Sequence, residues 1–193
     1  GDITVSSAIT TTGTGSLTLS AYHNIYLAAG TGFITLQGGS LTLRADNTGI
    51  GSGGVAIRAA INTNGGNVTI GGGSGAITAG SGYAVGNSDS VVGVYNNAPI
   101  NAGGGNIIIN GKSYAGNTAE NGVYILAQIT TTGSGSISIN GIAQGTGDQS
   151  HGVLIGGVTV QTATGALSVI GSSTATTLGS NGVYMDGSSS KTT

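Results

Sequence analysis

A phrase of Gly-Val followed by one variable residue recurs in the second half of the sequence at a nearly constant interval. Successive copies are separated by 29, 30 and 30 residues, since they begin at Gly93, Gly122, Gly152 and Gly182. A longer phrase also returns: ITTTGTGSLTL at residues 9–19 reappears as ITTTGSGSISI at residues 129–139. A fixed period of this size is typical of proteins built from stacked repeats, in which each repeat contacts only its neighbours.

Short stretches within each repeat alternate between apolar and polar residues, as in Leu17-Thr18-Leu19, Val68-Thr69-Ile70 and Ile137-Ser138-Ile139. Alternation with a period of two predicts β-strands that bury one face. Each complete repeat has three such stretches in the same order. Frequent β-branched residues and interrupting glycines disfavour helices longer than a turn. The chain is therefore predicted to be all-β.

A unit of about 22–30 residues with three short strands cannot bury its apolar face alone. Stacked in parallel on its neighbours, it adds its inward Val, Ile and Leu side chains to a continuous core. We therefore predict a parallel β-helix, or β-solenoid, with three short strands per coil and about seven coils. At roughly 4.8 Å per coil the stack would be about 34 Å long. The alternative, an antiparallel two-sheet sandwich, would need hairpin turns and does not account for the fixed period.

We predict that residues 1–193 form a single solenoid segment of a longer protein or of an end-to-end stack. Residues 54–193 contain the Gly-Val coils of about 30 residues, and residues 1–53 contain coils with different phrases. The unit that begins at Gly54 is 39 residues long, which points to an insertion around residues 80–92. The sequence starts within an alternation and stops within a repeat, so further coils are expected on both sides.

Three details of the repeat make specific predictions. Thr159 falls where the repeat requires an apolar residue, and because Val158 and Val160 flank it, a local register shift is expected. Asn96 falls on the inward face and is an exception to the apolar core. Asn110-Gly111 and Asn140-Gly141 close the third stretch of their repeats, and we expect positive φ at tight corners there.

The composition limits the functions open to the chain. Only four residues are basic, too few for the footprint of a protein that binds nucleic acid or an anionic membrane. Cysteine is absent, which excludes disulfides, thiolate metal sites and cysteine nucleophiles. No apolar run approaches the roughly 20 residues of a membrane helix, so no membrane insertion is expected, and no signal peptide is visible. With only 5% charged residues, the surface must instead present Ser, Thr, Asn and Gly to the solvent.

The first third of the chain contains the phrases GDITV, SLTLSA followed by NIYL, and GGSLTLRADNTG. In these phrases residues 1–50 resemble the repeat region of filamentous-haemagglutinin-type exoproteins, the bacterial adhesins exported by two-partner secretion. The Gly-Val units up to residue 187 match more loosely, as related β-helical repeats. The resemblance implies a right-handed parallel β-helix, export to the bacterial cell surface or medium, and adhesive or structural work without catalysis.

The expected function is therefore a non-catalytic extracellular rod or filament segment. Its expected partners are flanking coils of the same chain, other copies stacked end to end, and cell-surface glycans or proteins. No cofactor is expected. The alternative is a polysaccharide-acting β-helix enzyme, which would need several carboxylates and a basic residue clustered on one face.

The acidic residues and histidines give little support to that alternative. No two of the six acidic residues are adjacent or placed two or four apart, so no catalytic residue is assigned. His151-Gly152 is similar to the His-Gly of polygalacturonase-type sites, but the Asp pairs that accompany it there are missing. We expect His151 instead to close a loop at the position that Asn121 and Asn181 hold in the neighbouring units.

Glu120 and Asp148 fall in successive loops between units, and a calcium site along that ridge was considered. Calcium prefers six to eight oxygen ligands, usually with several carboxylates. One acidic residue per loop is too few for such a site, so solvated loop charges are the preferred interpretation and no metal site is assigned.

Tyrosine supplies the candidate contact residues. In the stretch after each Gly-Val phrase the Val points inward, so the next residue points outward. The outward residues are Tyr95, Tyr124, Leu154 and Tyr184, and Tyr26 is placed in the same way. Tyrosine rings offer flat apolar faces with a polar tip, which suits stacking on sugar rings or packing against a protein. We predict Tyr26, Tyr95, Tyr124 and Tyr184 as ligand or partner contacts; the alternative is that loops or a neighbouring filament cover them.

Outward threonines raise ice binding as a less favoured function, because flat solenoids use Thr-x-Thr ladders for it. Thr10 and Thr12 recur as Thr130 and Thr132. The intervening units carry Asn62 and Asn64, and then Asn101 and Gly103. The ladder is interrupted, which favours a rod over an ice-binding surface.

Overall fold

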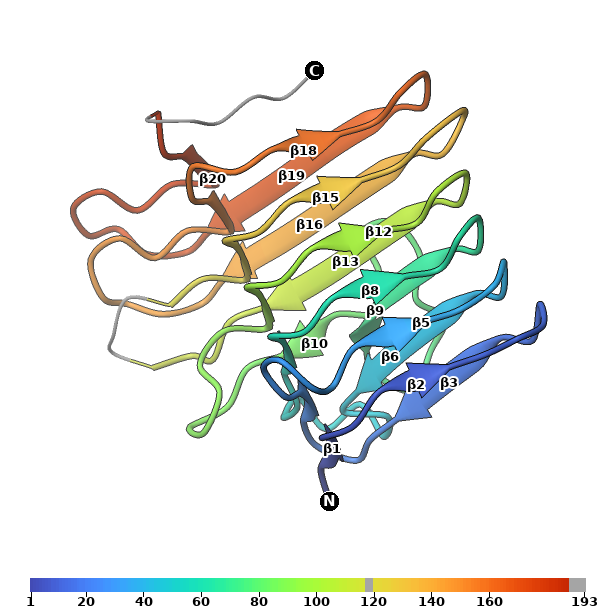
Figure 1. Cartoon of the computed structure of the whole chain (residues 1–193). Coiled ribbons are helices and arrows are strands. Elements are labelled where there is room, and N and C mark those ends of the chain that lie inside the picture. The colour runs from blue at the N-terminus through green and yellow to red at the C-terminus, as the bar shows by residue number, and fades with distance from the viewer. Residues whose placement is uncertain (117–119, 188–193) are drawn as a thin grey trace.

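The computed structural model describes residues 1–116 and 120–187, and its strands form three parallel sheets (Figure 1). The first sheet contains β1 (Ile3–Val5), β4 (Ile25–Leu27), β7 (Val55–Ile57), β11 (Val94–Asn96), β14 (Val123–Ile125), β17 (Val153–Ile155) and β20 (Val183–Met185). The second contains β2 (Ile9–Thr10), β5 (Ile34–Thr35), β8 (Ile61–Asn62), β12 (Ile100–Asn101), β15 (Ile129–Thr130) and β18 (Val160–Gln161). The third contains β3 (Leu17–Ser20), β6 (Leu41–Ala45), β9 (Val68–Gly72), β13 (Ile107–Lys112), β16 (Ile137–Ala143) and β19 (Leu167–Ser173), with the short β10 (Ala84–Val85) paired beside β13.

The chain passes once through each sheet in every coil, and neighbouring strands come from successive coils (Figure 1). Pairing places equivalent residues side by side, as Ile3 with Ile25 and Ile25 with Val55. The predicted parallel β-helix with three short strands per coil is thereby confirmed. The first sheet has seven strands, in agreement with the predicted seven coils. No helix that could cross a lipid bilayer occurs in the described residues.

A coil is defined here from the first residue of one first-sheet strand to the next. The six intervals are 22, 30, 39, 29, 30 and 30 residues, since the strands begin at residues 3, 25, 55, 94, 123, 153 and 183. The third coil is the long one, and it contains the insertion predicted around residues 80–92. β10 lies within that insertion and pairs Ala84 with Gly111 of the fourth coil.

The core is a stack of aliphatic rows that run along the coil axis. One row consists of Ile25, Val55, Val94, Val123 and Val153, each with no exposed surface. Each fully buried aliphatic side chain contributes roughly 1.5–3 kcal/mol to folding, but only when coils on both sides cover it. Ile3 in the first coil is accordingly only partly buried, and Val183 at the other end is 37% exposed.

The register shift predicted at Thr159 is confirmed. Val160 pairs with Ile129 of the preceding coil and is fully buried, so it takes the inward position that the repeat requires. Thr159 supplies instead the carbonyl oxygen that accepts a hydrogen bond from the backbone N–H of Ile129, at 3.1 Å. One extra residue in the preceding turn shifts the register locally, and the strands of the second sheet still pair through equivalent apolar residues.

Asn96 is buried in the core, as its place in the repeat predicts. It pairs with Ile57 on one side and Ile125 on the other, so it interrupts an aliphatic row. Its side-chain Nδ2 donates to the carbonyl oxygen of Ala127 at 3.4 Å. Its Oδ1 is fully buried and has no hydrogen-bond partner in the described part of the chain. A polar atom left in this state lowers stability.

The positive φ predicted for Asn110-Gly111 and Asn140-Gly141 is wrong. Strands β13 and β16 continue through these pairs, and none of the four residues has a positive φ. Glycine is required for close approach instead, because a Cβ on Gly141 would lie 1.9 Å from the carbonyl oxygen of Gly152. The asparagines bond to each other inside the stack, Asn140 Nδ2 donating to Asn110 Oδ1 at 2.8 Å.

A second polar ladder forms the corner between the second and third sheets, which we call the Ser/Asn ladder. Its members Ser16, Ser40, Asn67, Asn106 and Ser136 each accept, through a side-chain oxygen, the backbone N–H of the equivalent residue in the next coil, at 2.8–3.2 Å. A glycine precedes each member, and a Cβ on Gly39 or Gly66 would lie 2.0 Å from a carbonyl oxygen of the coil before. The phrase shared by residues 9–19 and 129–139 spans this corner, which explains its recurrence.

Candidate binding surface on the first sheet

The predicted tyrosines lie in one row on the outer face of the first sheet. Pairing places in this row Thr4, Tyr26, Ala56, Tyr95, Tyr124, Leu154 and Tyr184, one residue per coil. In β4, β11 and β14 the middle residue is half-buried between two buried neighbours, as expected of a side chain that faces outward. Tyr184 is more exposed, at 43%. The structure therefore brings the four tyrosines onto one face, and their role as contacts stays a prediction.

Ala56 and Leu154 divide this row into separate groups. Tyr95 and Tyr124 contact each other edge to face, with ring centroids 5.7 Å apart and planes inclined by 79°. The guanidinium carbon of Arg58 lies over the Tyr95 ring, 5.6 Å from its centroid, in a cation–π arrangement. Tyr26 stands on the other side of Ala56, which has too small a side chain to fill the space between the two rings.

The space over Ala56 is a groove with two adjoining hollows of about 330 and 220 Å³. The larger hollow reaches from Thr4 past Tyr26 to Ala28 and Ala29. The smaller one lies between Tyr26 and Tyr95 and is bounded by residues 89–92. Burial raises the pKa of Tyr26, and the negative charges of Asp2 and Asp89 raise it further. The Tyr26 hydroxyl is therefore a neutral donor at physiological pH.

The insertion in the third coil forms one wall of this groove. Its loop is fixed by Asn87, whose Oδ1 accepts the backbone N–H groups of Asp89 and Ser90 at 3.0 and 2.9 Å. Asn87 Nδ2 in turn donates to Oδ1 of Asn24 at 3.0 Å. The backbone N–H of Tyr114 donates to the carbonyl oxygen of Val91. These bonds hold Asp89 and Ser90 at the edge of the groove.

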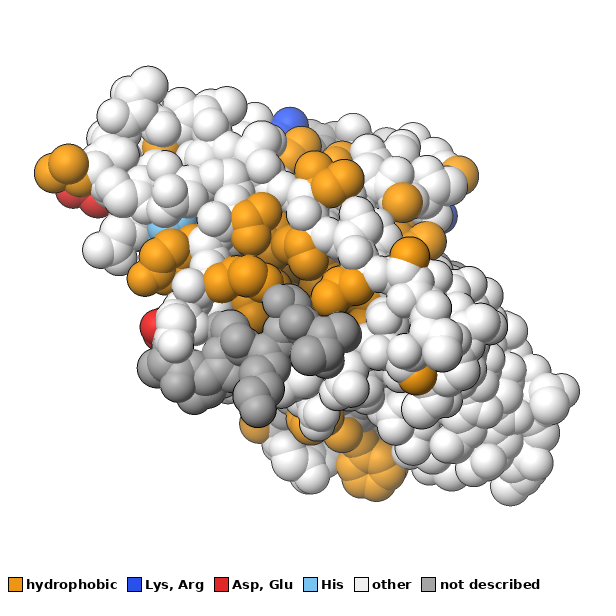
Figure 2. Space-filling model, turned by 90° about the horizontal axis from the view of Figure 1, so that it is seen from above, with side chains coloured by type: hydrophobic (Ala, Val, Ile, Leu, Met, Phe, Trp, Pro, Cys, Tyr) orange, Lys and Arg blue, Asp and Glu red, His pale blue; other side chains and the backbone are white. Residues whose placement is uncertain are grey.

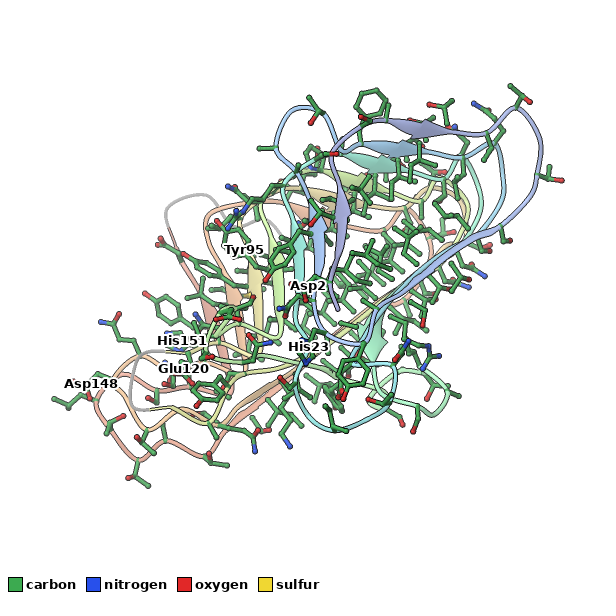
Figure 3. All side chains as sticks on the ribbon, turned by 90° about the horizontal axis from the view of Figure 1, so that it is seen from below. Asp2, His23, Tyr95, Glu120, Asp148 and His151 are labelled. Carbon is green, nitrogen blue, oxygen red and sulfur yellow. The ribbon has the colours of Figure 1, made fainter. Side chains whose placement is uncertain are left out.

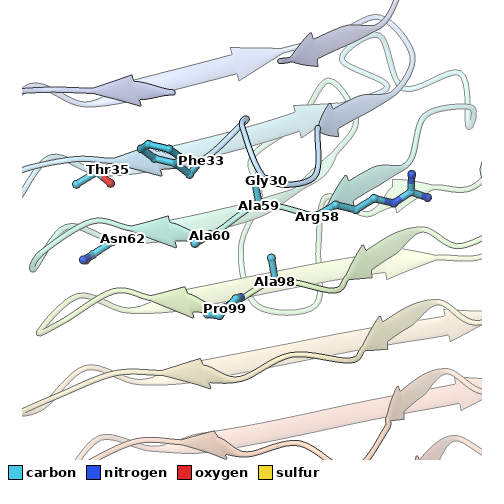
Figure 4. Close-up of a pocket in the computed structure, with 9 residues that line it drawn as sticks. All are labelled: Gly30, Phe33, Thr35, Arg58, Ala59, Ala60, Asn62, Ala98 and Pro99. Atoms are coloured by element: carbon cyan, nitrogen blue, oxygen red, sulfur yellow. The ribbon is translucent and has the colours of Figure 1, made fainter. Parts of the chain in front are cut away.

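A shorter insertion in the second coil forms the other wall. Nine residues separate Ile25 from Ile34, against six between Val55 and Ile61. The extra residues form a turn at residues 28–32, closed by a hydrogen bond from Gly32 N–H to the Ala28 carbonyl oxygen at 3.0 Å. Beyond this turn lies a third hollow, of about 370 Å³ (Figure 4).

The third hollow is apolar at its base and opens between three coils. It is lined by Gly30, Phe33, Thr35, Arg58, Ala59, Ala60, Asn62, Ala98 and Pro99. Phe33 is 40% exposed and stands on the side of the second coil, and the Arg58 side chain extends away from it toward the first sheet (Figure 4). Arg58 lines all three hollows. Its guanidinium has no hydrogen bond or ion pair with another residue of the described chain.

Two of the acidic residues, Asp2 and Asp46, accept hydrogen bonds from the backbone. Asp46 is buried, has φ 46°, and accepts the N–H groups of Ile50 and Gly51 through Oδ1 and Oδ2 at 2.9 and 2.8 Å. Asp2 Oδ1 accepts the N–H of Asn24 at 2.9 Å. Both carboxylates therefore accept backbone N–H groups at turns in place of a carbonyl oxygen. A carboxylate in this role does not require a second acidic residue nearby.

Glu120 and Asp148 differ in position. Glu120 is buried and accepts the N–H of Gly116 at 3.1 Å, whereas Asp148 is exposed on the outer loop of its coil (Figure 3). Within residues 1–116 and 120–187, no three His, Cys, Asp or Glu side chains gather so that they could hold a metal ion. Glu120 and Asp148 therefore do not belong to such a group among the described residues.

His151 lies at the position predicted for it, between Asn121 and Asn181 of the neighbouring coils. Its N–H donates to Asn121 Oδ1 at 3.0 Å, and its Nδ1 accepts the N–H of Asn181 at 3.3 Å. The imidazole is buried, and burial lowers the pKa of His151. A neutral His151, whose Nδ1 lone pair accepts the Asn181 N–H, is thus part of a third ladder.

The threonine row of the second sheet is more continuous than the sequence indicated. The pairing places Thr10, Thr35, Asn62, Asn101, Thr130 and Gln161 in line, so Thr35 was missed. Thr18, Thr42 and Thr69 form a further row on the third sheet, followed by Ile108. Both rows are interrupted in the middle coils.

Sequence reasoning also missed Arg58, Asp89 and Phe33. The anomalous 39-residue unit marked the loop that carries Asp89, and the wide spacing between Ile25 and Ile34 could have marked the turn beside Phe33. No known protein family matches the chain, and neither a curated protein nor a solved structure shows significant similarity to it. The resemblance of residues 1–50 to haemagglutinin-type repeats thus remains an expectation from the sequence.

Proposed function

We propose that the chain is a non-catalytic, extracellular structural and adhesive β-helical rod segment of a bacterial surface exoprotein. It contacts glycans, cells or other copies of itself through its lateral surface and its ends. The observation that carries this proposal is the in-register parallel stacking of coils through all three sheets. Such a stack presents a surface of fixed geometry along its whole length and does not require a closed globular core.

The polar ladders support a mechanical role for the stack. Each step of the Ser/Asn ladder adds one side-chain bond between neighbouring coils to those of the three sheets. The Asn110–Asn140 bond adds another within the stack. Because these bonds join neighbouring coils, they resist separation along the axis as well as lateral fraying.

The ends of the described stack support pairing with further coils. Seen from the C-terminal end, hydrophobic side chains gather at the centre of the molecule (Figure 2). Ile170 is 62% exposed, and Val183 and Met185 are 37% and 38% exposed. Among the described residues, strands β18, β19 and β20 each have a neighbour on one side only. A further coil, from the same chain or another copy, would cover these side chains and pair these edges.

The adhesive part of the proposal is supported by the tyrosine row, which presents four aromatic side chains on one face. It is tested by coating beads with the chain and counting the beads that adhere to epithelial cells under flow. The triple variant Tyr95→Ser, Tyr124→Ser, Tyr184→Ser is expected to abolish most of the adhesion. A matched variant on the third sheet, Thr42→Ala, Thr69→Ala, Ser138→Ala, is expected to leave it unchanged. Equal adhesion of both variants and the original chain would contradict the proposal.

A further inference from the structure

The two insertions that interrupt the uniform coil, one in the second coil and one in the third, border the same surface. The turn at residues 28–32 and the loop at residues 86–92 lie on different coils, yet both line hollows that share Arg58. Insertions that converge on one place in a repeat protein commonly shape its binding face.

We propose that this surface, the groove over Ala56 between Tyr26 and Tyr95, is a binding site for an uncharged glycan chain. This inference rests on the adhesive function proposed above and narrows it to one site and one ligand class. The groove is defined by Tyr26, Ala56, Arg58, Asp89 and Tyr95, which line its two hollows.

The groove has the aromatic platform that a sugar ring requires. Tyr26 and Tyr95 lie two coil steps apart, about 9.6 Å along the axis, and Ala56 forms the floor between them. The Ala56 side chain faces outward in the row but is only 4% exposed, because its surroundings rise above it. Tyrosine faces pack against the C–H surfaces of pyranose rings and keep the hydroxyl available for hydrogen bonds.

The polar groups around the platform suit hydroxyl groups. Arg58 offers several N–H donors in a fixed plane, and Asp89, which lines the same hollow, offers acceptor oxygens. Ser90 and the neutral Tyr26 hydroxyl add groups that both donate and accept. A pocket with an apolar floor and a few convergent polar side chains is the usual form of a small-ligand site.

The charges favour a neutral ligand over an acidic one. Arg58 carries one positive charge, and Asp2 and Asp89 act on Tyr26 from the same surface with two negative charges. An acidic sugar would gain from Arg58 and lose to the two carboxylates. An uncharged sugar avoids this repulsion and uses all three side chains through hydrogen bonds.

An extended peptide fits this surface less well. Peptides that bind sheets usually add a strand to a free edge. The strands beneath the groove, β4, β7 and β11, have neighbours on both sides, so their backbone groups are already paired. The groove therefore offers side chains and no backbone, which suits a ligand with hydroxyl groups on its rings.

The experiment is a titration of the whole chain, followed by NMR signals of the Arg58 Nε–H and the tyrosine rings. The probes are four neutral hexasaccharides (cellohexaose, maltohexaose, xylohexaose and mannohexaose) and the acidic hexagalacturonate. At least one neutral probe is expected to bind saturably and shift the signals of Arg58, Tyr26 and Tyr95. Tyr95→Ala and Arg58→Gln are each expected to weaken that binding at least tenfold.

Two further variants separate binding from folding. Ala56→Leu fills the groove without removing a ring or a charge, and it is expected to abolish binding with an unchanged melting temperature. Thr42→Ala, on the third sheet and away from the groove, is expected to bind as the original chain does. The inference is overturned if no neutral probe binds up to about 10 mM, if hexagalacturonate binds more tightly, or if Ala56→Leu and Thr42→Ala behave alike.

The bead assay distinguishes this inference from the proposed function. Beads that adhere to cells although no neutral probe binds in the groove retain the adhesive function and refute the glycan site. Saturable binding in the groove without adhesion of the beads supports the site and refutes the adhesive function.

Discussion

The imidazole ring of His151 stacks on the phenol ring of Tyr184, with centroids 4.7 Å apart and planes inclined by 12°. The two residues lie in different coils, His151 before β17 and Tyr184 in the middle of β20. The stacked ring is also the one whose Nδ1 accepts the N–H of Asn181. A proton on Nδ1 would remove this acceptor and place a charge in a buried position.

Stability is therefore expected to fall in mild acid through His151. Its pKa in the folded chain lies below the unfolded value of 6.5, because burial disfavours the charged form. The unfolded chain then binds more protons, so the stability is present above pH 6.5 and is lost as the pH falls through the lowered pKa. Melting temperatures of the original chain and of His151→Asn, measured between pH 4.5 and 8 (about the range in which histidine titrates), test this. The variant keeps a ladder acceptor and should lose the histidine part of the pH dependence; identical profiles would contradict the prediction.

Replacing Asn96 by Leu is expected to stabilise the chain. Asn96→Leu removes the buried Oδ1 that has no partner and restores the aliphatic row, for a gain of about 1–3 kcal/mol. The control is Ile57→Asn, which puts the same amide at the equivalent place in the preceding coil and should destabilise by more than about 3 kcal/mol. Denaturant unfolding of both variants is the measurement. A loss of stability in Asn96→Leu would show that the amide is needed where it is.

Glycines at the corner beside the Ser/Asn ladder are expected to tolerate no side chain. In Gly66→Ala the new Cβ would lie 2.0 Å from the carbonyl oxygen of Gly39, so coils must separate, at a cost of more than about 2 kcal/mol. Gly104 belongs to the same turn in the next coil, has no atom within 4 Å of its Cβ position, and has no positive φ. Gly104→Ala is therefore the matched control and should change the melting temperature little. Similar losses for both would argue against close approach as the cause.

The Ser/Asn ladder itself is expected to contribute modestly at each step. Asn106→Ala removes the acceptor of the Ser136 N–H and should cost about 0.5–1.5 kcal/mol. Asn106→Ser keeps an acceptor of the kind found at Ser16 and Ser40 and should cost less. Hydrogen exchange at the Ser136 amide gives the direct measurement, because that amide should exchange faster in Asn106→Ala alone. Unchanged exchange in Asn106→Ala would mean that water replaces the side chain without loss.

The stacking of the coils was predictable from the sequence because it depends on two periods. Alternation of period two decides which side chains point inward, and the Gly-Val interval decides which residues become neighbours. Even the register shift at Thr159 followed from this reasoning, because Val158 and Val160 flank it; the structure shows that Val160 takes the inward position. The corner prediction at Asn110-Gly111 failed because glycine serves two purposes, positive φ and close approach, and the sequence does not distinguish them.

The groove was not predictable in the same way. Tyr26 and Tyr95 were placed by alternation, but the open space between their rings depends on the small residue Ala56 in the coil between. The loop that carries Asp89 is held by the bond from Asn87 to Asn24, 63 residues apart in the chain. Contacts of that kind have no local sequence signal. The unusual length of the third coil therefore predicted that a loop was present, but not which residues the loop would contact.

The long third coil leaves the pairing on either side of it undisturbed. Val94 still pairs with Val55, as it would if the coil between them had the ordinary length. A coil can therefore gain or lose a surface loop while its neighbours keep their partners. Variation in such a protein can accumulate one coil at a time, so that new surface chemistry arises without a new fold.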